Sequence, residues 1–194
     1  MKTVFFDIDS QLDFLYPAGA LYVPCAGRIV PAIAQLNRYA ALHGITVVST
    51  TDAHAENDPE FATWPPHCIA GTTGQHKAEA TLLERRLVIP NRECDLALED
   101  APQIVVEKQT VDVFAAPNLR LVVERLKADR YMVYGVVTEI CVLFAVRGLL
   151  KTGKPVTVVS DAVETLKAED GVRALESIRA AGGTLARVSE LVGY

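Results

Sequence analysis

The chain has 194 residues, of which 50% are hydrophobic and 22% charged. This composition is typical of a folded protein and excludes an intrinsically disordered one. Its formal net charge of -5 comes without a long run of Lys or Arg, so we expect no nucleic-acid partner. No segment reaches about 18 apolar residues and the start lacks a signal-peptide pattern, so we expect no membrane segment and a cytoplasmic location. The length suits a single domain over residues 1–194.

Short β-rich apolar runs alternate along the chain with amphipathic stretches of helical period. We predict strands over residues 3–8, 45–49, 104–107, 131–135, 156–160 and 184–188. We predict helices over residues 28–43, 118–128, 141–151 and 171–181. Strands joined by helices in this way predict an α/β class, with a three-layer α/β/α, Rossmann-like fold and a parallel sheet of about six strands.

Residues with reactive side chains follow several of the predicted strands. In parallel sheets of this kind, ligands bind beyond the carboxyl ends of the strands. The residues at such positions are Asp9, Asp52, His54, Lys108 and Cys141. The irregular stretch over residues 52–77 is too long for a simple connection, so we predict that it is functional.

Cys141 is a candidate nucleophile because it lies at the start of a predicted helix. The positive end of the helix dipole favours a thiolate, and free backbone N–H groups at the same place can bind an oxyanion. The alternative for any cysteine of this chain is a small buried hydrophobic residue. The spacing of the four cysteines predicts reduced thiols rather than disulfides: Cys25, Cys68, Cys94 and Cys141.

Asp9 and Lys108 could supply the base and the cation that a thiol needs to react at neutral pH. Taken singly, an Asp after a strand is a turn former or a helix cap, and a Lys there is a solvated surface group. We prefer that simpler interpretation for Asp7 and Asp13. Asp9 and Lys108 gain a catalytic role only together with Cys141.

The stretch that follows the strand over residues 45–49 places a carboxylate and imidazoles close together. Asp52 and His54 flank one residue, and His67 follows in the same loop, which is enough for a divalent ion such as Zn, Mn or Fe. The alternative is a capped loop with ordinary surface histidines. We predict that His43 and His76 are surface residues.

These segments together resemble the isochorismatase-like cysteine hydrolases, and within them the nicotinamidase or pyrazinamidase branch, over nearly the whole chain. The family's opening motif, with its catalytic aspartate at Asp9, is matched by Ile8-Asp9-Ser10-Gln11-Leu12-Asp13-Phe14. Its catalytic-lysine strand is matched by Glu107-Lys108, and its nucleophile motif by Gly135-Val136-Val137-Thr138-Glu139-Ile140-Cys141. Three motifs in the family's order make a specific signal.

The resemblance implies one isochorismatase-like hydrolase domain and an amide hydrolase that works through a thioester. In that scheme Asp9 takes the proton of Cys141, the thiolate attacks the amide carbon, and Lys108 stabilises the charged partners. The resemblance also implies a non-proline cis peptide between Val136 and Val137. This peptide turns the Val137 N–H beside that of Cys141, and the two form the oxyanion hole.

The nicotinamidase branch also carries a metal, and the resemblance puts Asp52, His54 and His67 at its ligand positions. A further His that many members use is absent from this sequence. Some members use a Glu seven residues before the last His, so Glu60 is a predicted ligand and Asp58 is its competitor. Zinc is the first choice for the single divalent ion, with Mn or Fe as alternatives.

The branch implies a substrate and the walls that hold it. Its metal coordinates the ring nitrogen of a pyridine carboxamide, and Phe14 and Trp64 resemble the aromatic walls around the ring. Core packing is the alternative for both side chains. The implied reaction converts nicotinamide and water to nicotinate and ammonia in pyridine nucleotide salvage, and we expect a homo-oligomer with a small-molecule amide as its substrate.

Other functions stay open at this point. Metal-free members of the family hydrolyse ureido or carbamoyl compounds, which are the alternative substrates. The start of the chain also resembles the nucleophile motif of haloacid-dehalogenase-type phosphatases, with Asp7 as nucleophile, but residues 159–163 lack the paired acidic residues that would bind Mg²⁺. A non-catalytic binding module would have lost a triad residue, and Asp9, Lys108 and Cys141 are all present.

Overall fold

A seven-stranded parallel β-sheet forms the centre of the protein in the computed structural model, which describes residues 1–98 and 101–192. The strand order is β3-β4-β2-β1-β5-β6-β7, and every neighbouring pair is parallel. The strands are β1 (Thr3–Ile8), β2 (Thr46–Asp52), β3 (Arg86–Ile89), β4 (Gln103–Lys108), β5 (Arg130–Gly135), β6 (Val156–Val163) and β7 (Thr184–Ala186).

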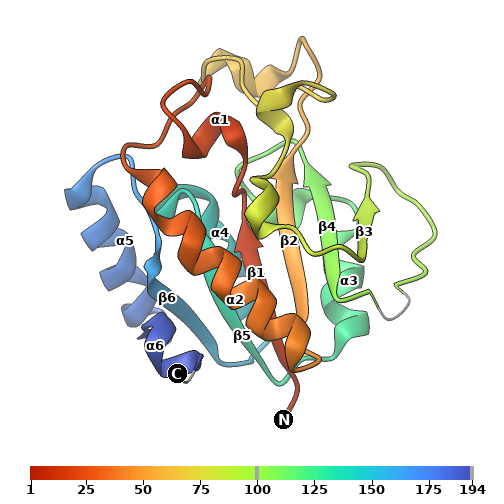
Figure 1. Ribbon diagram of the computed structural model, residues 1–194, viewed down its shortest axis with the longest axis vertical. Helices are drawn as coiled ribbons and strands as arrows, with labels where there is room; N and C mark the ends of the chain where they lie inside the picture. The colour runs from red at the N-terminus through yellow and green to blue at the C-terminus, as the bar shows by residue number, and fades with distance from the viewer. Residues whose placement is uncertain (99–100, 193–194) are drawn as a thin grey trace.

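Helices cover both faces of this sheet and give the three layers that the sequence predicted (Figure 1). Residues of α1, α2 and α6 pack on one face, and residues of α3, α4 and α5 on the other. The α-helices are α1 (Leu12–Leu15), α2 (Val30–Leu42), α3 (Leu119–Leu126), α4 (Leu143–Leu150), α5 (Ala168–Ala180) and α6 (Val188–Leu191). Short 3₁₀-helices are η1 (Ala26–Ile29), η2 (Pro59–Ala62), η3 (Thr73–Gln75), η4 (Glu79–Thr81) and η5 (Val113–Ala115), and η6 (Thr138–Val142) is a π-helix.

The central strand β1 shows how the sequence divides the hydrophobic core. Successive side chains of a strand point to opposite faces, so Phe5 joins the core beneath α2 while Phe6 joins the core beneath α3 and α4. Every residue of β1 is buried. A strand covered on both faces needs apolar residues at nearly every position, which explains the continuous run from Val4 to Phe6.

All six predicted strands are confirmed, but the prediction of about six strands missed β3 at the edge of the sheet. This strand has only four residues, and two of them, Arg86 and Val88, are exposed. A run this short carries too few positions for a period to be recognised. The predicted helix that starts at Cys141 was also placed too late, because η6 begins at Thr138 and α4 follows it.

The position of β1 in the sheet explains where a site can form. β1 pairs with β2 on one side and with β5 on the other, so the chain leaves β1 toward one half of the sheet and later returns to fill the other half. The crevice beyond the carboxyl ends of such strands is where ligands bind in parallel α/β sheets. The residues that follow β1, β2, β4 and β5 therefore meet at one end of the molecule.

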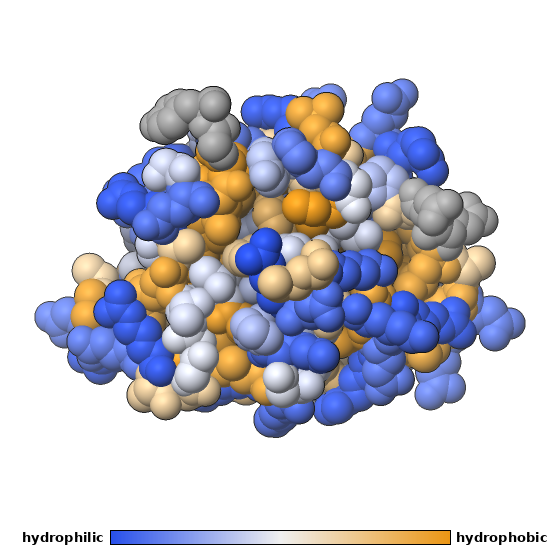
Figure 2. Space-filling model, turned by 90° about the horizontal axis from the view of Figure 1, so that it is seen from below, coloured by the Kyte–Doolittle hydropathy of each residue, from blue (hydrophilic) through white to orange (hydrophobic). Residues whose placement is uncertain are grey.

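The opposite end of the molecule, seen from below in Figure 2, carries hydrophobic residues in separate patches among hydrophilic ones. The N-terminus and α6 lie toward this end (Figure 1). Among the described residues, no helix combines the length and the apolar character needed to cross a membrane. The carboxyl ends of the strands remain the place to look for a functional site.

Candidate active site and metal centre

Asp9, Lys108 and Cys141 meet at the carboxyl end of the sheet. Asp9 follows β1, Lys108 is the last residue of β4, and Cys141 lies in η6 after β5. The Nζ atom of Lys108 lies 2.9 Å from Oδ2 of Asp9 and 3.9 Å from Sγ of Cys141. All three side chains are buried. The structure thus brings together three residues that are far apart in the sequence.

Thr50 on β2 holds the Asp9 carboxylate in one orientation. Its hydroxyl donates to Oδ1 of Asp9 at 2.7 Å, and its carbonyl accepts the Asp9 N–H at 3.2 Å. Oδ2 of Asp9 lies beside Lys108 at ion-pair distance but has no aligned hydrogen bond among the described residues. One carboxylate oxygen is therefore occupied, while the other is available to accept a proton.

The backbone that leads to Cys141 is shaped by a close approach between strands. Gly135 has a φ of +117°, and a Cβ at this position would collide with the carbonyl oxygen of Ile8, so only glycine fits here. The peptide between Val136 and Val137 is cis, which confirms the prediction. Within the described residues the Val137 N–H makes no backbone hydrogen bond, so it is available for its predicted role as an oxyanion donor.

Burial raises the pKa of Cys141 well above its usual range; the Lys108 ammonium lowers it, and the carboxylates of Asp9 and Asp52 raise it further. The prediction that a helix dipole favours the thiolate stays a prediction, because the causes that shift this pKa are burial and neighbouring charges. Cys141 lies inside η6, directly before α4, and burial raises its pKa more than Lys108 lowers it. A thiol with a raised pKa needs a base before it can attack.

Lys108 provides the positive charge of this site. Burial by itself lowers the pKa of Lys108, but Asp52 and Asp9 outweigh burial and hold that pKa well above its ordinary value. The side chain is thus an ammonium ion between two carboxylates and a thiol. Such an ion stabilises negative charge on the sulfur whenever the thiol loses its proton.

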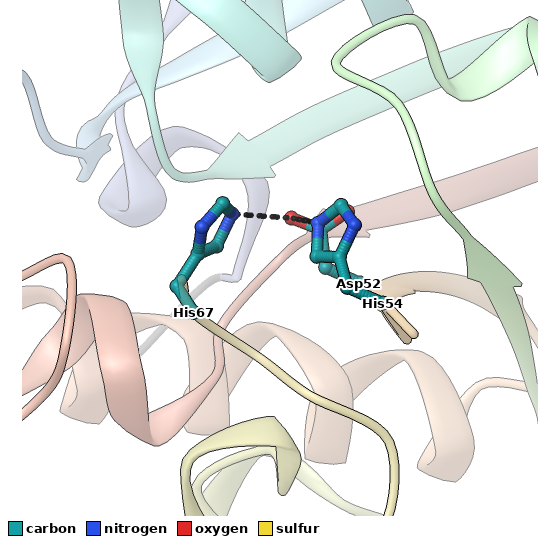
Figure 3. Close-up of side chains that lie close together, drawn as sticks. All are labelled: Asp52, His54 and His67. Carbon is teal, nitrogen blue, oxygen red and sulfur yellow. Dashed lines mark ion pairs between the residues drawn. The ribbon is translucent and has the colours of Figure 1, made fainter. Parts of the chain in front are cut away.

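Asp52, His54 and His67 form a second cluster beside the first. One ligand atom of each lies within 4.8 Å of the others, and Nε2 of each histidine lies 3.9 Å from Oδ2 of Asp52 (Figure 3). All three are buried, and Nε2 of His54 has no hydrogen-bond partner among the described residues. A buried imidazole nitrogen without a partner, beside a second imidazole and a carboxylate, fits the donor set of a divalent ion.

Backbone contacts order the loop that carries this cluster. His54 and Ile69 form an isolated parallel bridge, with hydrogen bonds from the His54 N–H to Cys68 at 3.1 Å and from the Ala70 N–H to His54 at 2.9 Å. Oδ2 of Asp13 accepts the Cys68 N–H at 2.7 Å. Asp13 lies inside α1 and connects it to this distant loop, so the prediction that Asp13 forms a turn or caps a helix is wrong. The long irregular stretch is a supported loop around the cluster.

The two acidic candidates of this loop occupy different places. Glu60 lines the same pocket as Asp52 and His67, but it is not among the three residues whose ligand atoms converge. Asp58 instead lies behind His54, with its Oδ2 atom 3.0 Å from Nδ1 of the ring. Burial raises the pKa of Asp58, but the hydrogen bond from the Glu60 N–H and the close His54 ring outweigh burial and hold that pKa below its usual value. Asp58 is therefore a charged neighbour of the cluster.

Asp52 joins the two clusters. Its Oδ1 atom forms a close ion pair with Lys108, while Oδ2 faces the two histidines. Gln11 fixes the backbone of Asp52 from both sides, because its Oε1 accepts the Asp52 N–H at 2.7 Å and its Nε2 donates to the Asp52 carbonyl at 2.9 Å. The sequence analysis missed Gln11 as a positioning residue. The feature of the sequence that could have identified Gln11 is its position between Asp9 and Asp13 in the opening motif.

A pocket of about 390 Å³, counted with its opening to solvent, borders both clusters. Its walls include Phe14 and Trp64, the two side chains predicted to flank a ring. Phe14 also packs against His67 with ring centroids 5.4 Å apart, so it is both a core residue and a wall of the pocket. Because Cys141 and Asp52 line the same pocket, a small molecule inside it can reach both clusters at once.

The remaining candidate residues, Asp7, His43 and His76, lie outside the two clusters. Asp7 is not a turn former or cap: it lies within β1, is fully buried, and its Oδ2 atom is 3.3 Å from Nζ of Lys77. It does not line the pocket, so the phosphatase interpretation lacks an accessible nucleophile. His43 and His76 are exposed, as predicted.

A buried cysteine with a paired Asp and Lys, presented at the carboxyl end of a parallel α/β sheet, is the arrangement of a cysteine hydrolase. The family model of the isochorismatase domain matches residues 3–190, which is most of the sequence. The chain belongs to the isochorismatase family.

Similar proteins and solved structures cover nearly the whole chain. The chain is 29% identical over 180 residues to an uncharacterised isochorismatase family protein, PncA, of Bacillus subtilis (strain 168), which covers 90% of this chain and 93% of that protein. It is similar to the zinc complex of the pyrazinamidase of Pyrococcus horikoshii, with a TM-score of 0.80 and 29% identity over 96% of this chain and 99% of that one. The pyrazinamidase/nicotinamidase of Streptococcus mutans UA159 has a TM-score of 0.81 and 27% identity over 95% of this chain and 100% of that one.

Proposed function

We propose that this protein is a metal-dependent amide hydrolase of the nicotinamidase type, which converts nicotinamide and water to nicotinate and ammonia. The observation that carries the proposal is one small pocket lined by Cys141, Asp52 and His67 together. The pocket gives a substrate simultaneous contact with a nucleophile and with the predicted metal ligands. The similar pyrazinamidase and nicotinamidase structures support this class of substrate.

The first half of the reaction uses the proton acceptor and donors described above. Cys141 starts as a thiol and passes its proton to Oδ2 of Asp9, and the thiolate attacks the amide carbon. The N–H groups of Val137 and Cys141 stabilise the oxyanion. Protonated Asp9 then donates to the leaving nitrogen, so that ammonia departs and a thioester remains on the sulfur.

The second half uses the same carboxylate in reverse. Asp9 takes a proton from water, the hydroxide oxygen adds to the thioester carbon, and the carboxylic acid leaves as Cys141 regains a proton. Lys108 lies within 4 Å of both the carboxylate and the sulfur, so its ammonium stabilises whichever of them is negative at each stage. No residue beyond these is needed for the proton balance.

We assign the divalent ion, with zinc as the first choice, to Asp52, His54 and His67, with Glu60 as a further ligand from the pocket wall. When bound, the ion supplies a Lewis-acid contact for the ring nitrogen of the substrate and positions it. Zinc in the similar Pyrococcus horikoshii pyrazinamidase supports this choice. The walls of the pocket exclude water from the ring, since most of its lining side chains are apolar.

We also propose that residues 1–194 form one isochorismatase-like hydrolase domain. The family match spans residues 3–190, and the two hydrophobic cores lie on the two faces of the same sheet. Outside that match, too few of the 194 residues are left to form a second domain.

The experiment that tests this function is an ammonia-release assay with nicotinamide, pyrazinamide and a ureido compound, before and after treatment with a chelator. We expect hydrolysis of the two ring carboxamides, about one divalent ion per chain by elemental analysis, loss of hydrolysis on chelation and recovery on adding zinc. Alkylation of Cys141 should change less than hydrolysis, because positioning the substrate and activating the thiol are separate tasks. Full activity in metal-free protein, with the ureido compound preferred, would move the assignment to the metal-independent amidases.

A further inference from the structure

The two histidines of the cluster share one arrangement of their ring nitrogens. In each ring Nε2 faces Oδ2 of Asp52 at 3.9 Å. Nδ1 of His67 contacts the Pro65 carbonyl at 2.8 Å, and Nδ1 of His54 lies 3.0 Å from Oδ2 of Asp58. The second contact has the distance of a hydrogen bond but not its full alignment.

Asp58 makes a second contact through its other carboxylate oxygen. Oδ1 accepts the Glu60 N–H at 2.9 Å and so caps the N-terminus of η2. The helix carries Phe61, whose ring centroid lies 5.2 Å from that of His54 and 5.8 Å from that of His67. One carboxylate thus contacts the ring of His54 and also fixes the helix that packs against both histidines.

We propose that Asp58 is a positioning residue for the metal site: it holds His54 with Nδ1 protonated and Nε2 free to bind the ion, and it holds η2 against both imidazoles. The inference rests on the metal site of the proposed function and adds a residue that does not itself bind the ion. An acceptor behind a metal-binding histidine selects the tautomer and the direction of the ring. Asp58 does this for His54 as the Pro65 carbonyl does for His67.

Two substitutions at this position separate the contact with His54 from the cap of η2. In Asp58→Asn the side-chain oxygen can still cap η2, but the amide then presents N–H donors to Nδ1. This favours the tautomer with a proton on Nε2, which cannot bind an ion. In Asp58→Ser the hydroxyl also caps η2 but is too short to reach the ring, so neither tautomer is favoured.

Asp112 offers a matched control elsewhere in the chain. It caps η5 as Asp58 caps η2, with the Phe114 N–H donating to its Oδ1 atom at 2.9 Å. Among the described residues it has no contact with a histidine. Asp112→Asn therefore makes the same chemical change at the same kind of cap without touching the metal cluster.

The experiment measures zinc affinity of the full-length wild type and the three variants by competition with a chromogenic chelator. Circular dichroism checks that each variant is folded. We expect Asp58→Asn to weaken zinc binding by about 10- to 100-fold, Asp58→Ser to weaken it less, and Asp112→Asn to leave it unchanged. Nitrogen-proton correlation spectra of the metal-free proteins should show His54 protonated on Nδ1 in the wild type and on Nε2 in Asp58→Asn, a difference that a purely structural role for Asp58 does not produce.

The outcomes distinguish this inference from the proposed function. Wild-type affinity in Asp58→Asn, or equal losses in the Asn and Ser variants, would overturn the role of Asp58 while leaving the metal site in place. Failure of the wild type to bind zinc at all would overturn the metal site and this inference with it. The expected order of affinities, with Asp58→Asn the weakest, supports both.

Discussion

Asp7 and Asp9 stand two residues apart at the end of β1, and each carboxylate pairs with a buried lysine. Oδ2 of Asp9 lies 2.9 Å from Lys108, and Oδ2 of Asp7 lies 3.3 Å from Lys77. None of the four residues is more than 6% exposed. By charge, distance and burial alone the two pairs are nearly equivalent. Only the Asp9–Lys108 pair contacts residues that line the pocket, because Lys108 contacts Cys141 and Asp52.

The neighbours of the two pairs differ. Asp7 is surrounded by neutral donors, with the Asn37 amide at 3.2 Å and the Ser49 hydroxyl at 3.3 Å from its Oδ2 atom, and Tyr134 donates in turn to Asn37. Asp9 instead faces a thiol and a second carboxylate through Lys108. A buried Asp–Lys pair is therefore not sufficient for a catalytic site. Catalysis also needs a reactive side chain beside the pair and a pocket from which a substrate can reach that side chain.

The largest effect on turnover is expected from Cys141→Ala, which removes the reactive group that distinguishes the two pairs. Turnover should fall by a factor on the order of 10⁴ or more, because no other side chain at the site can form the thioester. Stability should fall by only about 1 kcal/mol, since one sulfur atom is lost from a packed site. Steady-state ammonia release and chemical denaturation measure the two quantities. Retained turnover would show that Cys141 is not the nucleophile.

Asp9→Asn is expected to have the next largest effect. The amide cannot accept the thiol proton, so kcat should fall by about 10² to 10⁴, the usual contribution of general acid–base catalysis. Substrate binding should be kept, because Asp9 does not line the pocket. The comparison of kcat with KM in steady-state kinetics provides the check. A variant with near wild-type kcat would remove Asp9 from the mechanism.

The sequence predicted the reactive pair more readily than the structural one, and the reason is geometric. Asp9, Lys108 and Cys141 each lie at or just beyond the end of a strand whose apolar pattern is strong, so their meeting follows from the parallel sheet. Lys77 lies in the irregular stretch between β2 and β3, where no period indicates which way a side chain points. Its partner Asp7 was consequently interpreted as a turn former.

The same limit applies within the metal loop. Asp52 and His54 could be recognised because they directly follow the pattern of β2, and His67 because an imidazole in a compact loop is informative. The contact of Asp58 with His54 depends on how η2 folds back, which is set by packing of Phe61 against the histidine rings. Helix and strand propensities along the chain do not predict this packing. Asp58 could therefore be identified from the sequence only as an alternative metal ligand to Glu60.

The smallest effect on turnover is expected from Lys77→Met, even though its effect on stability should be large. Removing the ammonium leaves the Asp7 carboxylate buried without a cation, which should lower the free energy of unfolding by about 3 to 5 kcal/mol. A second substitution, Asp7→Asn, should recover part of this loss because it removes the stranded charge and keeps a hydrogen-bonding side chain. Denaturant unfolding of the single and double variants measures both changes.

Lys108→Met is the matched control, because it makes the same change in the pair that contacts Cys141 and Asp52 in the pocket wall. Among the described residues, the Lys77 ammonium reaches toward the active site through its contact with the Thr50 carbonyl at 3.3 Å, and the Thr50 hydroxyl still donates to Asp9 without it. The backbone bridge between Lys77 and Gln11 does not depend on the side chain. The kcat of folded Lys77→Met should therefore change by less than about tenfold, the effect of one lost hydrogen bond. Lys108→Met should lose kcat about as strongly as Asp9→Asn, because Lys108 contacts both Asp9 and Cys141. Equal losses of kcat in the two Met variants would mean that the Asp7 pair also acts in catalysis, and the contrast between the two pairs would fail.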